Sequence, residues 1–233
     1  AQANLTMALG YNRPDDIPIT LSTVMQNIID DKTLDVSQGI IHHSEGVDLL
    51  PSNIEMSGFE VRLINAMSRE RVLKTYVNEV KKNYDYVLID CMPSLGMITI
   101  NALAAADSVI IPTQPHYLSA KGLELLLRSV SMVKRQINPK LRIDGILMTM
   151  VMPRTNISKE ITATVKSAYG KKIKVFDTEI PHSIRAVEAT AEGKSIFAYD
   201  KSGKVAAAYE QLGKEVAEIG EKQRNQNRAD RIR

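Results

Sequence analysis

The chain has 233 residues, of which 44% are hydrophobic and 24% are charged, and its formal net charge is +3 at pH 7. This composition predicts an ordinary globular protein, and no apolar run approaches the roughly 20 residues that span a bilayer. A single cysteine excludes a disulfide framework and a cysteine-rich metal site within one chain, while the weak positive charge leaves room only for a local basic face. We therefore expect a cytoplasmic protein with no membrane partner.

Apolar, β-rich runs alternate with helical patterns along the chain, and neither a repeat nor a Gly/Ser linker interrupts them. The runs are nearly continuous in apolar character, as strands covered on both faces of a parallel sheet should be. The predicted strands are residues 47–50, 86–90, 108–113, 143–151 and 174–180.

Helical spacing of apolar residues predicts helices between these runs. They span residues 20–31, 69–82, 98–106, 119–137, 156–170 and 203–219. Ser119 is a candidate N-cap, and Gly170 suits the position just after a helix end. The alternation predicts the α/β class, with a doubly wound, mostly parallel sheet flanked by helices in a single domain over residues 1–233. Ligands bind such sheets beyond the carboxyl ends of the strands, where Asp90 and residues 150–154 lie.

The run YVLID ends on Asp90. Cys91 and Met92 follow it, and a Pro-Ser-x-Gly turn comes directly after them at residues 93–96. A carboxylate at the end of a buried strand can accept hydrogen bonds from water on Mg²⁺, as a Walker B aspartate does. Pro93 would stiffen the turn, Ser94 could cap the next helix, and Gly96 would let backbone approach a phosphate. The alternative is that Asp90 and Ser94 are only turn and cap residues, but the added turn favours a phosphate and metal site.

A longer block then becomes informative: residues 84–127 read YDYVLIDCMPSLGMITINALAAADSVIIPTQPHYLSAKGLELLL. This block resembles switch II and the following strand and helix of the ParA/Soj branch of deviant-Walker ATPases, which are related to MinD. The similarity continues through residues 47–63, 145–155 and 176–200, and it ends near 206–216. The resemblance implies a P-loop NTPase-like fold and an ATPase of plasmid, chromosome or mobile-element partitioning.

The same resemblance implies cofactors and partners. ATP and Mg²⁺ would close a dimer of two identical chains, the dimer would bind duplex DNA without sequence preference on the nucleoid, and a ParB-like protein would stimulate hydrolysis. Asp90 would be catalytic and would hold Mg²⁺ through water. The residues with expected nucleotide or switch roles are Gln2, Asn4, Pro93, Ser94, Gly96, Met150, Pro153, Pro181 and His182.

The start of the chain carries a further expectation. In the family, a Gly-rich P-loop with two lysines and a strand that ends in aspartate precede a segment similar to AQANLTMALG. Here that segment is residues 1–10. We therefore expect this chain to lack the P-loop and the first strand, and not to hydrolyse ATP by itself.

The family also carries arginines and lysines for sequence-independent DNA binding, which requires only phosphate contacts. By resemblance, the candidates here are Arg154, Lys159, Lys166, Arg185 and Lys194. The family's IPRNVR-like segment reads IPHSIR in this chain, so His182 replaces one arginine and Arg185 keeps the other. For each of these residues, an ordinary charged surface remains an equally open interpretation.

The C-terminal tail at residues 221–233, EKQRNQNRADRIR, is polar and basic. It lacks the apolar face that a MinD-type membrane helix requires. Two alternatives to a partitioning ATPase stay open at this point. One is a MinD-like membrane-associated ATPase, against which the tail argues, and the other is a nucleotide-free scaffold or regulatory module.

Overall fold

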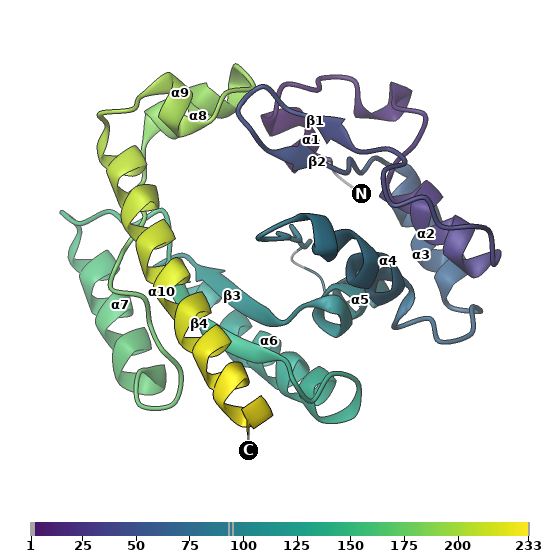
Figure 1. Cartoon of the computed structure of the whole chain (residues 1–233). Helices are drawn as coiled ribbons and strands as arrows, with labels where there is room; N and C mark the ends of the chain where they lie inside the picture. The colour runs from purple at the N-terminus through teal and green to yellow at the C-terminus, as the bar shows by residue number, and fades with distance from the viewer. Residues whose placement is uncertain (1–2, 93, 95, 233) are drawn as a thin grey trace. The chain divides into compact units, whose positions relative to one another are not determined.

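The computed structural model describes residues 3–92, 94 and 96–232. The chain forms two compact units (Figure 1). The first contains the chain up to Asp107 together with Leu126–Leu141 and Ala189–Ser195, and the second contains Ser108–Leu125, Arg142–Glu188 and the chain from Ile196 onward. The prediction of a single domain is not tested by this division and stays a prediction.

The first unit is mostly helical. Its elements in chain order are α1 (Asn4–Ala8), the 3-10 turn η1 (Pro14–Asp16), α2 (Leu21–Ile29), β1 (Ile41–His42), β2 (Asp48–Leu49), α3 (Glu55–Leu63), α4 (Val72–Val80), the 3-10 turn η2 (Lys81–Asn83) and α5 (Met97–Ala105). Helices α2, α3, α4 and α5 pack around one core, to which Met25, Phe59 and Leu63 contribute fully buried side chains. The helical spacing predicted over residues 69–82 is confirmed in α4, because the five apolar residues of its stripe are all buried: Val72, Leu73, Tyr76, Val77 and Val80.

A buried asparagine explains why α4 begins later than its sequence pattern predicts. Asn101 lies on α5 and is 0% exposed. Its Oδ1 accepts a hydrogen bond from the backbone N–H of Leu73 (3.1 Å), and its Nδ2 donates to the carbonyl of Arg69 (2.7 Å). Because the first N–H groups of a helix have no partner inside the helix, this side chain stabilises the start of α4 at Val72.

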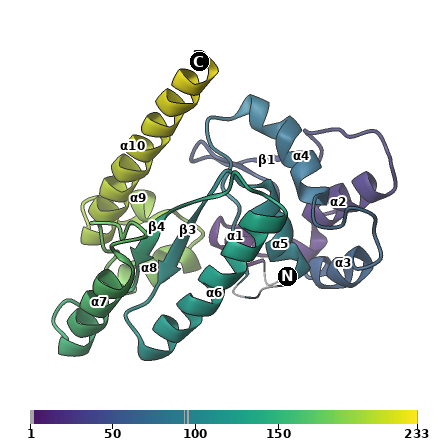
Figure 2. The ribbon, with the colours of Figure 1, turned by 90° about the horizontal axis from the view of Figure 1, so that it is seen from below.

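The second unit is built on two parallel strands. Its elements are β3 (Ser108–Thr113), the first half of α6 (Tyr117–Gln136), β4 (Arg142–Met148), α7 (Asn156–Tyr169), most of α8 (Ile184–Ala191), α9 (Ile196–Tyr199) and α10 (Lys204–Ile232). Strands β3 and β4 pair from Ser108 opposite Arg142 to Thr113 opposite Met148, with one irregularity between Val109 and Ile110. Figure 2 shows the two strands side by side. This pair confirms the predicted strand at 108–113 and most of the predicted strand at 143–151, which ends at Met148.

The predicted strand at 174–180 follows β4 only in part. Phe176 donates a backbone hydrogen bond to Ile146 (2.9 Å), and Ile180 donates one to Met148 (2.9 Å). Two isolated parallel bridges, Ile146 with Val175 and Val151 with Pro181, continue the alignment. Helix α10 packs against this segment and β4 through Val205, and Phe176 is fully buried between them. The segment therefore extends the parallel arrangement without forming a continuous strand.

The prediction of a strand at residues 86–90 is wrong. In the described part of the chain these residues have no regular secondary structure and pair with no strand. Leu88 is 89% exposed and Tyr86 is 54% exposed. An apolar run becomes a strand only where a neighbour satisfies its backbone N–H and C=O groups, and no described segment does so here.

The predicted strand at 47–50 is also corrected, because it belongs to a local hairpin instead of the parallel sheet. Its β2 pairs antiparallel with β1, with Ile41 opposite Leu49 and His42 opposite Asp48. Gly46 turns the chain with a φ of +79°, a conformation that glycine adopts at little cost. The sequence interpretation missed β1 because its two residues are too short to show a period-2 pattern.

Three helix ends differ from their predictions. Helix α6 begins at Tyr117, so Ser119 lies inside the helix and is not its N-cap. Gly170 follows α7 as expected, but its φ of −59° is right-handed and does not use glycine's freedom. Helix α10 continues to Ile232, well past the predicted end at 219, and includes the backbone of the basic tail as far as that residue.

Among the described residues, none of the helices is long and apolar enough to span a membrane.

Candidate functional site

Asp90 ends the mostly exposed segment 86–90 of the first unit. Asp90 is exposed, and no described group of three or more His, Cys, Asp or Glu side chains is arranged to hold a metal ion. Magnesium in phosphate sites usually keeps several waters and takes only one or two carboxylates from the protein. A single exposed carboxylate such as Asp90 is therefore compatible with a Mg²⁺ ion that takes most of its ligands from phosphates and water.

Glu60 anchors the other end of the loop that begins at Asp90. The backbone N–H of Ile98, in the first turn of α5, donates a hydrogen bond to Glu60 Oε1 (3.3 Å). The carboxylate lies against Gly96, where a Cβ atom would overlap Glu60 Oε1. Carboxylates are favoured at helix N-termini because they meet free N–H groups and the positive end of the helix dipole. Gly96 thus admits a carboxylate from α3 in this structure, a partner that sequence reasoning missed.

Ser94 has a different role from the predicted helix cap. Helix α5 has Gly96 as its N-cap, and the Ser94 carbonyl accepts a hydrogen bond from Thr99 Oγ1 (2.6 Å). Ser94 therefore helps to close the turn through its backbone, and Glu60 supplies the oxygen that the Ser94 side chain was expected to supply. Of the other switch candidates, Pro93 and Gln2 lie outside the described residues, and Asn4 is exposed at the start of α1.

The second unit brings four of the predicted nucleotide residues to two adjacent turns. The backbone N–H of Val151 donates to the Ile180 carbonyl (3.0 Å), and that of His182 donates to the Val151 carbonyl (3.0 Å). These bonds set Met150 and Pro153 beside Pro181 and His182. Met150 has a φ of +51°, which is uncommon for a residue with a side chain. The two turns follow β4 and the segment beside it, where ligands of parallel sheets bind.

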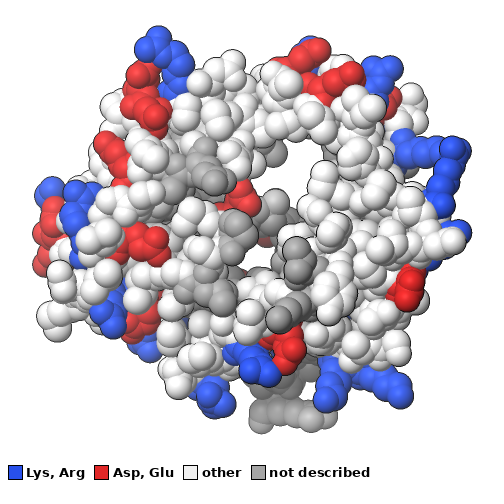
Figure 3. Space-filling model, turned by 180° about the vertical axis from the view of Figure 1, so that it is seen from behind, with Lys and Arg blue, Asp and Glu red and all other residues white. Residues whose placement is uncertain are grey.

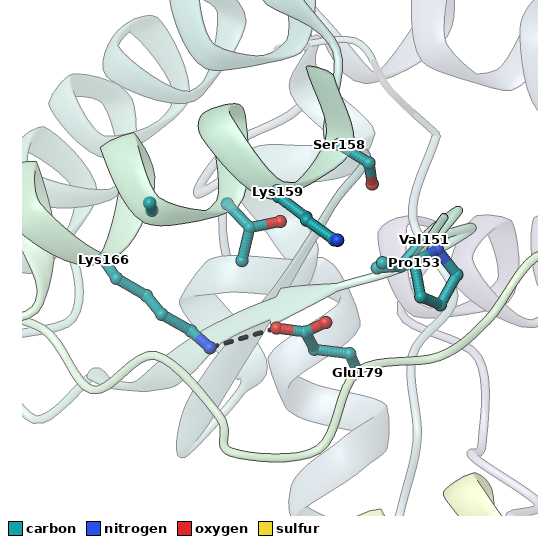
Figure 4. A pocket seen from close by; sticks show the side chains of 8 residues that line it. Val151, Pro153, Ser158, Lys159, Lys166 and Glu179 are labelled. Carbon is teal, nitrogen blue, oxygen red and sulfur yellow. Dashed lines mark hydrogen bonds and ion pairs between the residues drawn. The ribbon is translucent and has the colours of Figure 1, made fainter. Parts of the chain in front are cut away.

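A pocket of about 370 Å³ opens beside these turns, between α7 and the segment that leads to Pro181 (Figure 4). It is lined by Val151, Pro153, Ser158, Lys159, Thr162, Ala163, Lys166 and Glu179. Lys166 Nζ forms an ion pair with Glu179 Oε1 (3.0 Å), whereas Lys159 has no ion-pair partner among the residues that the structure describes. The pocket therefore combines an apolar end at Val151 and Pro153 with a cationic group that is available to an anion.

The remaining basic candidates are exposed and lie on different elements. Arg154 is in the turn before α7, and Arg185 is in the first turn of α8. The Arg185 guanidinium lies 4.0 Å from Glu188 and above the ring of Tyr199, while Lys194 pairs with Glu192 (2.8 Å). Exposed ion pairs of this kind contribute little stability, so Arg185 and Lys194 could leave their glutamate partners and contact phosphate instead. On the face shown in Figure 3, Lys and Arg side chains occur in small groups, several of them next to Asp or Glu.

Known proteins with similar sequences and structures first define the fold class of this chain. The family model described as an AAA domain matches residues 1–143. A solved structure described as cobyrinic acid a,c-diamide synthase from Mycobacterium smegmatis, with bound ATP analog and magnesium, is 31% identical to this chain. It superimposes with a TM-score of 0.76 over 89% of this chain and 74% of that one. The chain thus has the α/β fold of P-loop NTPases, as the family resemblance implies.

Two curated relatives narrow the class to a family. The sporulation initiation inhibitor protein Soj of Bacillus subtilis is 40% identical over 94% of this chain and 84% of its own length. The chromosome partitioning protein ParA of Myxococcus xanthus is 36% identical over 92% of this chain and 74% of its own length. The chain belongs to the ParA/Soj family of chromosome-partitioning ATPases. The family model matches from residue 1, so it gives no support to the expectation that a P-loop segment is missing.

Proposed function

We propose that this chain acts in DNA partitioning as a Soj-like ATPase that forms a dimer with Mg·ATP. The observation that carries the proposal is the 40% identity to Soj over 94% of this chain. In the proposed cycle, the ATP-bound dimer binds duplex DNA without sequence preference, and a ParB-like partner stimulates hydrolysis and release. The protein would work in the cytoplasm on the nucleoid.

Asp90 has the central chemical role in this proposal. Bound Mg²⁺ would offset the negative charge on the transferring phosphoryl group. Asp90 would accept hydrogen bonds from water on that metal and so fix its position. Its exposure leaves the carboxylate free for this task. Glu60, by holding the start of α5, would keep the loop between Asp90 and Gly96 in one conformation.

The second unit would hold the base of the nucleotide. Met150 and Pro153 on one turn, with Pro181 and His182 on the other, present backbone groups and apolar side chains at a strand end. Such turns can recognise a planar ring by shape and by backbone hydrogen bonds. Arg154, Lys159, Lys166, Arg185 and Lys194 are the proposed phosphate contacts for DNA. Because Lys159 and Lys166 also line the pocket, they are the candidates that could contact nucleotide instead.

The proposal is tested by replacing Asp90 with alanine in the full gene product. We expect ATP turnover to fall at least about 100-fold, as when one preorganised electrostatic group is removed from an active site. Because Asp90 is exposed and makes no core contact, thermal stability should stay close to that of the wild type. Steady-state phosphate release and a thermal melt measure the two quantities.

Asp85 provides a matched control, since it is an exposed aspartate just before the same segment, five residues earlier than Asp90. Asp85→Ala should retain wild-type turnover. A folded Asp90→Ala protein that hydrolyses ATP at the normal rate would show that Asp90 is only a turn residue, and the proposed mechanism would be wrong.

Two further measurements separate the alternatives. The expectation that these 233 residues alone do not turn over ATP stays a prediction, and micromolar Mg·ATP binding by calorimetry would contradict it. Sedimentation with liposomes distinguishes a partitioning ATPase from a MinD-like membrane ATPase. We expect the full gene product to remain in the supernatant with ATP present.

A further inference from the structure

The pocket between α7 and the segment that leads to Pro181 contains hydroxyl groups that the fold leaves partly unused (Figure 4). Ser158 and Thr162 are one turn apart on α7, and they are only 1% and 7% exposed. Thr162 Oγ1 has no hydrogen-bond partner among the described residues. Ser158 Oγ accepts a bond from the backbone N–H of Met152 (3.3 Å) but donates none to a described group. Buried hydroxyls without a partner are costly and uncommon in native proteins, so this pair indicates a partner that the chain itself does not supply.

The charges around the pocket leave room for one negative charge. Two lysines and one glutamate line it, so these side chains carry a net charge of +1. Lys166 is paired with Glu179 (3.0 Å), and Lys159 has no ion-pair partner in the part of the chain that the structure describes. Figure 4 shows the Lys159 side chain extending from α7 towards the segment that carries Glu179. A monoanion would balance this charge, whereas a dianion would bring its second charge towards Glu179 and be repelled.

The remaining walls limit the size and the polarity of a ligand. Val151 and Pro153 form an apolar end, and Ala163 adds a small apolar side chain on α7. The volume of about 370 Å³ lies at the low end of the range for small-molecule sites, which is about 300–1,000 Å³. Such sites combine apolar walls with a few polar groups that orient the ligand. A ligand of this pocket therefore has a short anionic group and a compact apolar body.

We propose that this pocket binds a small organic monocarboxylate. The carboxylate accepts hydrogen bonds from the hydroxyls of Ser158 and Thr162 and pairs with the Lys159 ammonium. The branched or aromatic body of the ligand lies against Val151 and Pro153. A carboxylate has two oxygens with several acceptor positions, which matches two hydroxyl donors and one cation. The site goes beyond the proposed ATPase activity, and it shares only Pro153 with the residues proposed to hold the base of the nucleotide.

An NMR chemical-shift titration of the full gene product tests the site with benzoate and benzamide. The two probes have the same ring and nearly the same size, but only benzoate is charged. We expect benzoate to shift amide signals of α7 around Thr162 in a saturable way, with a Kd of about 1 mM or below. Benzamide should bind at least about tenfold more weakly, because it lacks the charge that pairs with Lys159.

Two variants identify the groups that hold the carboxylate. Lys159→Ala should raise the Kd of benzoate at least about fivefold, because the ion pair is lost. Thr162→Val keeps the shape of the side chain but removes the hydroxyl, so it should raise this Kd by about three- to tenfold. Since that hydroxyl has no described partner inside the fold, the melting temperature of the ligand-free variant should stay the same or rise. Lys171→Ala changes an exposed lysine just after α7 that does not line the pocket, and this matched control should leave the Kd unchanged.

Each contrary outcome overturns the proposal for a different reason, and none of them affects the proposed function. Benzoate that gives no saturable shift well above the expected Kd shows that the pocket takes no such ligand. Equal affinities for benzoate and benzamide, or a Kd that neither variant changes, show only non-specific apolar contact. A lower melting temperature in Thr162→Val with unchanged benzoate binding assigns the hydroxyl to the fold. Saturating Mg·ADP should leave the Kd of benzoate unchanged, and displacement of benzoate by ADP would make the pocket part of the nucleotide site.

Discussion

At the scale of single residues, Glu60 is the side chain that most affects how the Asp90 loop can be interpreted. Sequence reasoning assigned Ser94 to the cap of the following helix and Gly96 to phosphate approach. The structure instead places the Glu60 carboxylate at the first turn of α5, against Gly96. No local pattern could show this contact, because Glu60 and Ile98 are 38 residues apart in the chain.

Replacement of Glu60 by alanine should destabilise the start of α5 by about 1 kcal/mol, the usual cost of losing a helix cap. In the full gene product, ATP turnover should also fall, because the loop after Asp90 loses its anchor. Glu60→Gln keeps an oxygen that can accept the hydrogen bond from Ile98, so it should recover most of both quantities. Thermal melts and steady-state kinetics on the three proteins measure the effects. Equal turnover in all three would show that the loop needs no support from α3.

A second residue-scale prediction concerns the hairpin of β1 and β2. The Tyr84 hydroxyl donates to Asp48 Oδ2 (2.6 Å), and His42 Nδ1 lies 2.6 Å from Asp48 Oδ1. The hydrogen bond to Asp48 raises the pKa of Tyr84 to about 12, from an ordinary value near 10. The bond from Tyr84, followed by that from His42, lowers the pKa of Asp48.

The two shifts have opposite consequences with pH. The raised pKa of Tyr84 gives stability that is complete below about pH 10 and is lost as the pH rises towards 12. The lowered pKa of Asp48 gives stability that is present above about pH 4 and is lost on further acidification. We expect Tyr84→Phe to remove the alkaline loss of stability and to remove one ionisation near pH 12 from the ultraviolet absorbance titration. An unchanged titration curve in Tyr84→Phe would contradict the predicted pKa of this hydroxyl.

At the scale of elements, Glu215 fixes α10 to the chain beside β4. Its Oε1 accepts hydrogen bonds from the backbone N–H of Thr178 (2.9 Å) and from Thr178 Oγ1 (2.5 Å), and its Oε2 accepts from the N–H of Asp177 (3.3 Å). Lys174 Nζ lies 3.4 Å away. Burial raises the pKa of Glu215, but the bonds from Thr178, Asp177 and Lys174 outweigh burial and leave the pKa below its ordinary value.

Glu215→Ala should lower the free energy of unfolding by about 2 kcal/mol, because it leaves the buried N–H of Thr178 and the part-buried N–H of Asp177 without an acceptor. Glu218 on the same helix is exposed, and Glu218→Ala should change stability by no more than about 0.5 kcal/mol. Urea unfolding at neutral pH measures both variants. Equal midpoints would mean that apolar packing of α10 alone holds this segment.

At the scale of the whole molecule, DNA binding should depend on dimerisation. The net charge is only +3, and exposed arginines such as Arg154 and Arg185 lie on separate elements, so one copy offers few phosphate contacts. Two copies would double them. Because each phosphate contact releases counterions, the affinity for duplex DNA should fall steeply as salt rises.

Arg185→Ala should weaken binding to all duplex sequences alike and make the salt slope shallower by about 1.8 units for the dimer, one contact per protomer. ATP binding should stay nearly unchanged. Lys81→Ala, an exposed lysine in the first unit, should leave the slope as it is. Fluorescence anisotropy at several salt concentrations with ATP present gives the slopes. Wild-type affinity and slope in Arg185→Ala would identify Arg185 as an ordinary surface residue, and the DNA contacts would lie elsewhere.

The sequence by itself determined the features that depend on neighbouring residues. The apolar stripe of α4, the parallel strands β3 and β4, and the turns after them follow from periodicity and from the short run of residues at each strand end. The motif at Asp90 and the family resemblance also lie in contiguous blocks, and comparison with Soj and ParA confirms the family.

Only the tertiary structure decided what depends on distant residues. The run at 86–90 is apolar enough for a strand, yet a strand forms through hydrogen bonds to a neighbour, and no described segment supplies them. The start of α4 is fixed by Asn101 and that of α5 by Glu60, each from another helix. Burial and hydrogen-bond partners are properties of the folded chain, so local sequence patterns cannot determine them.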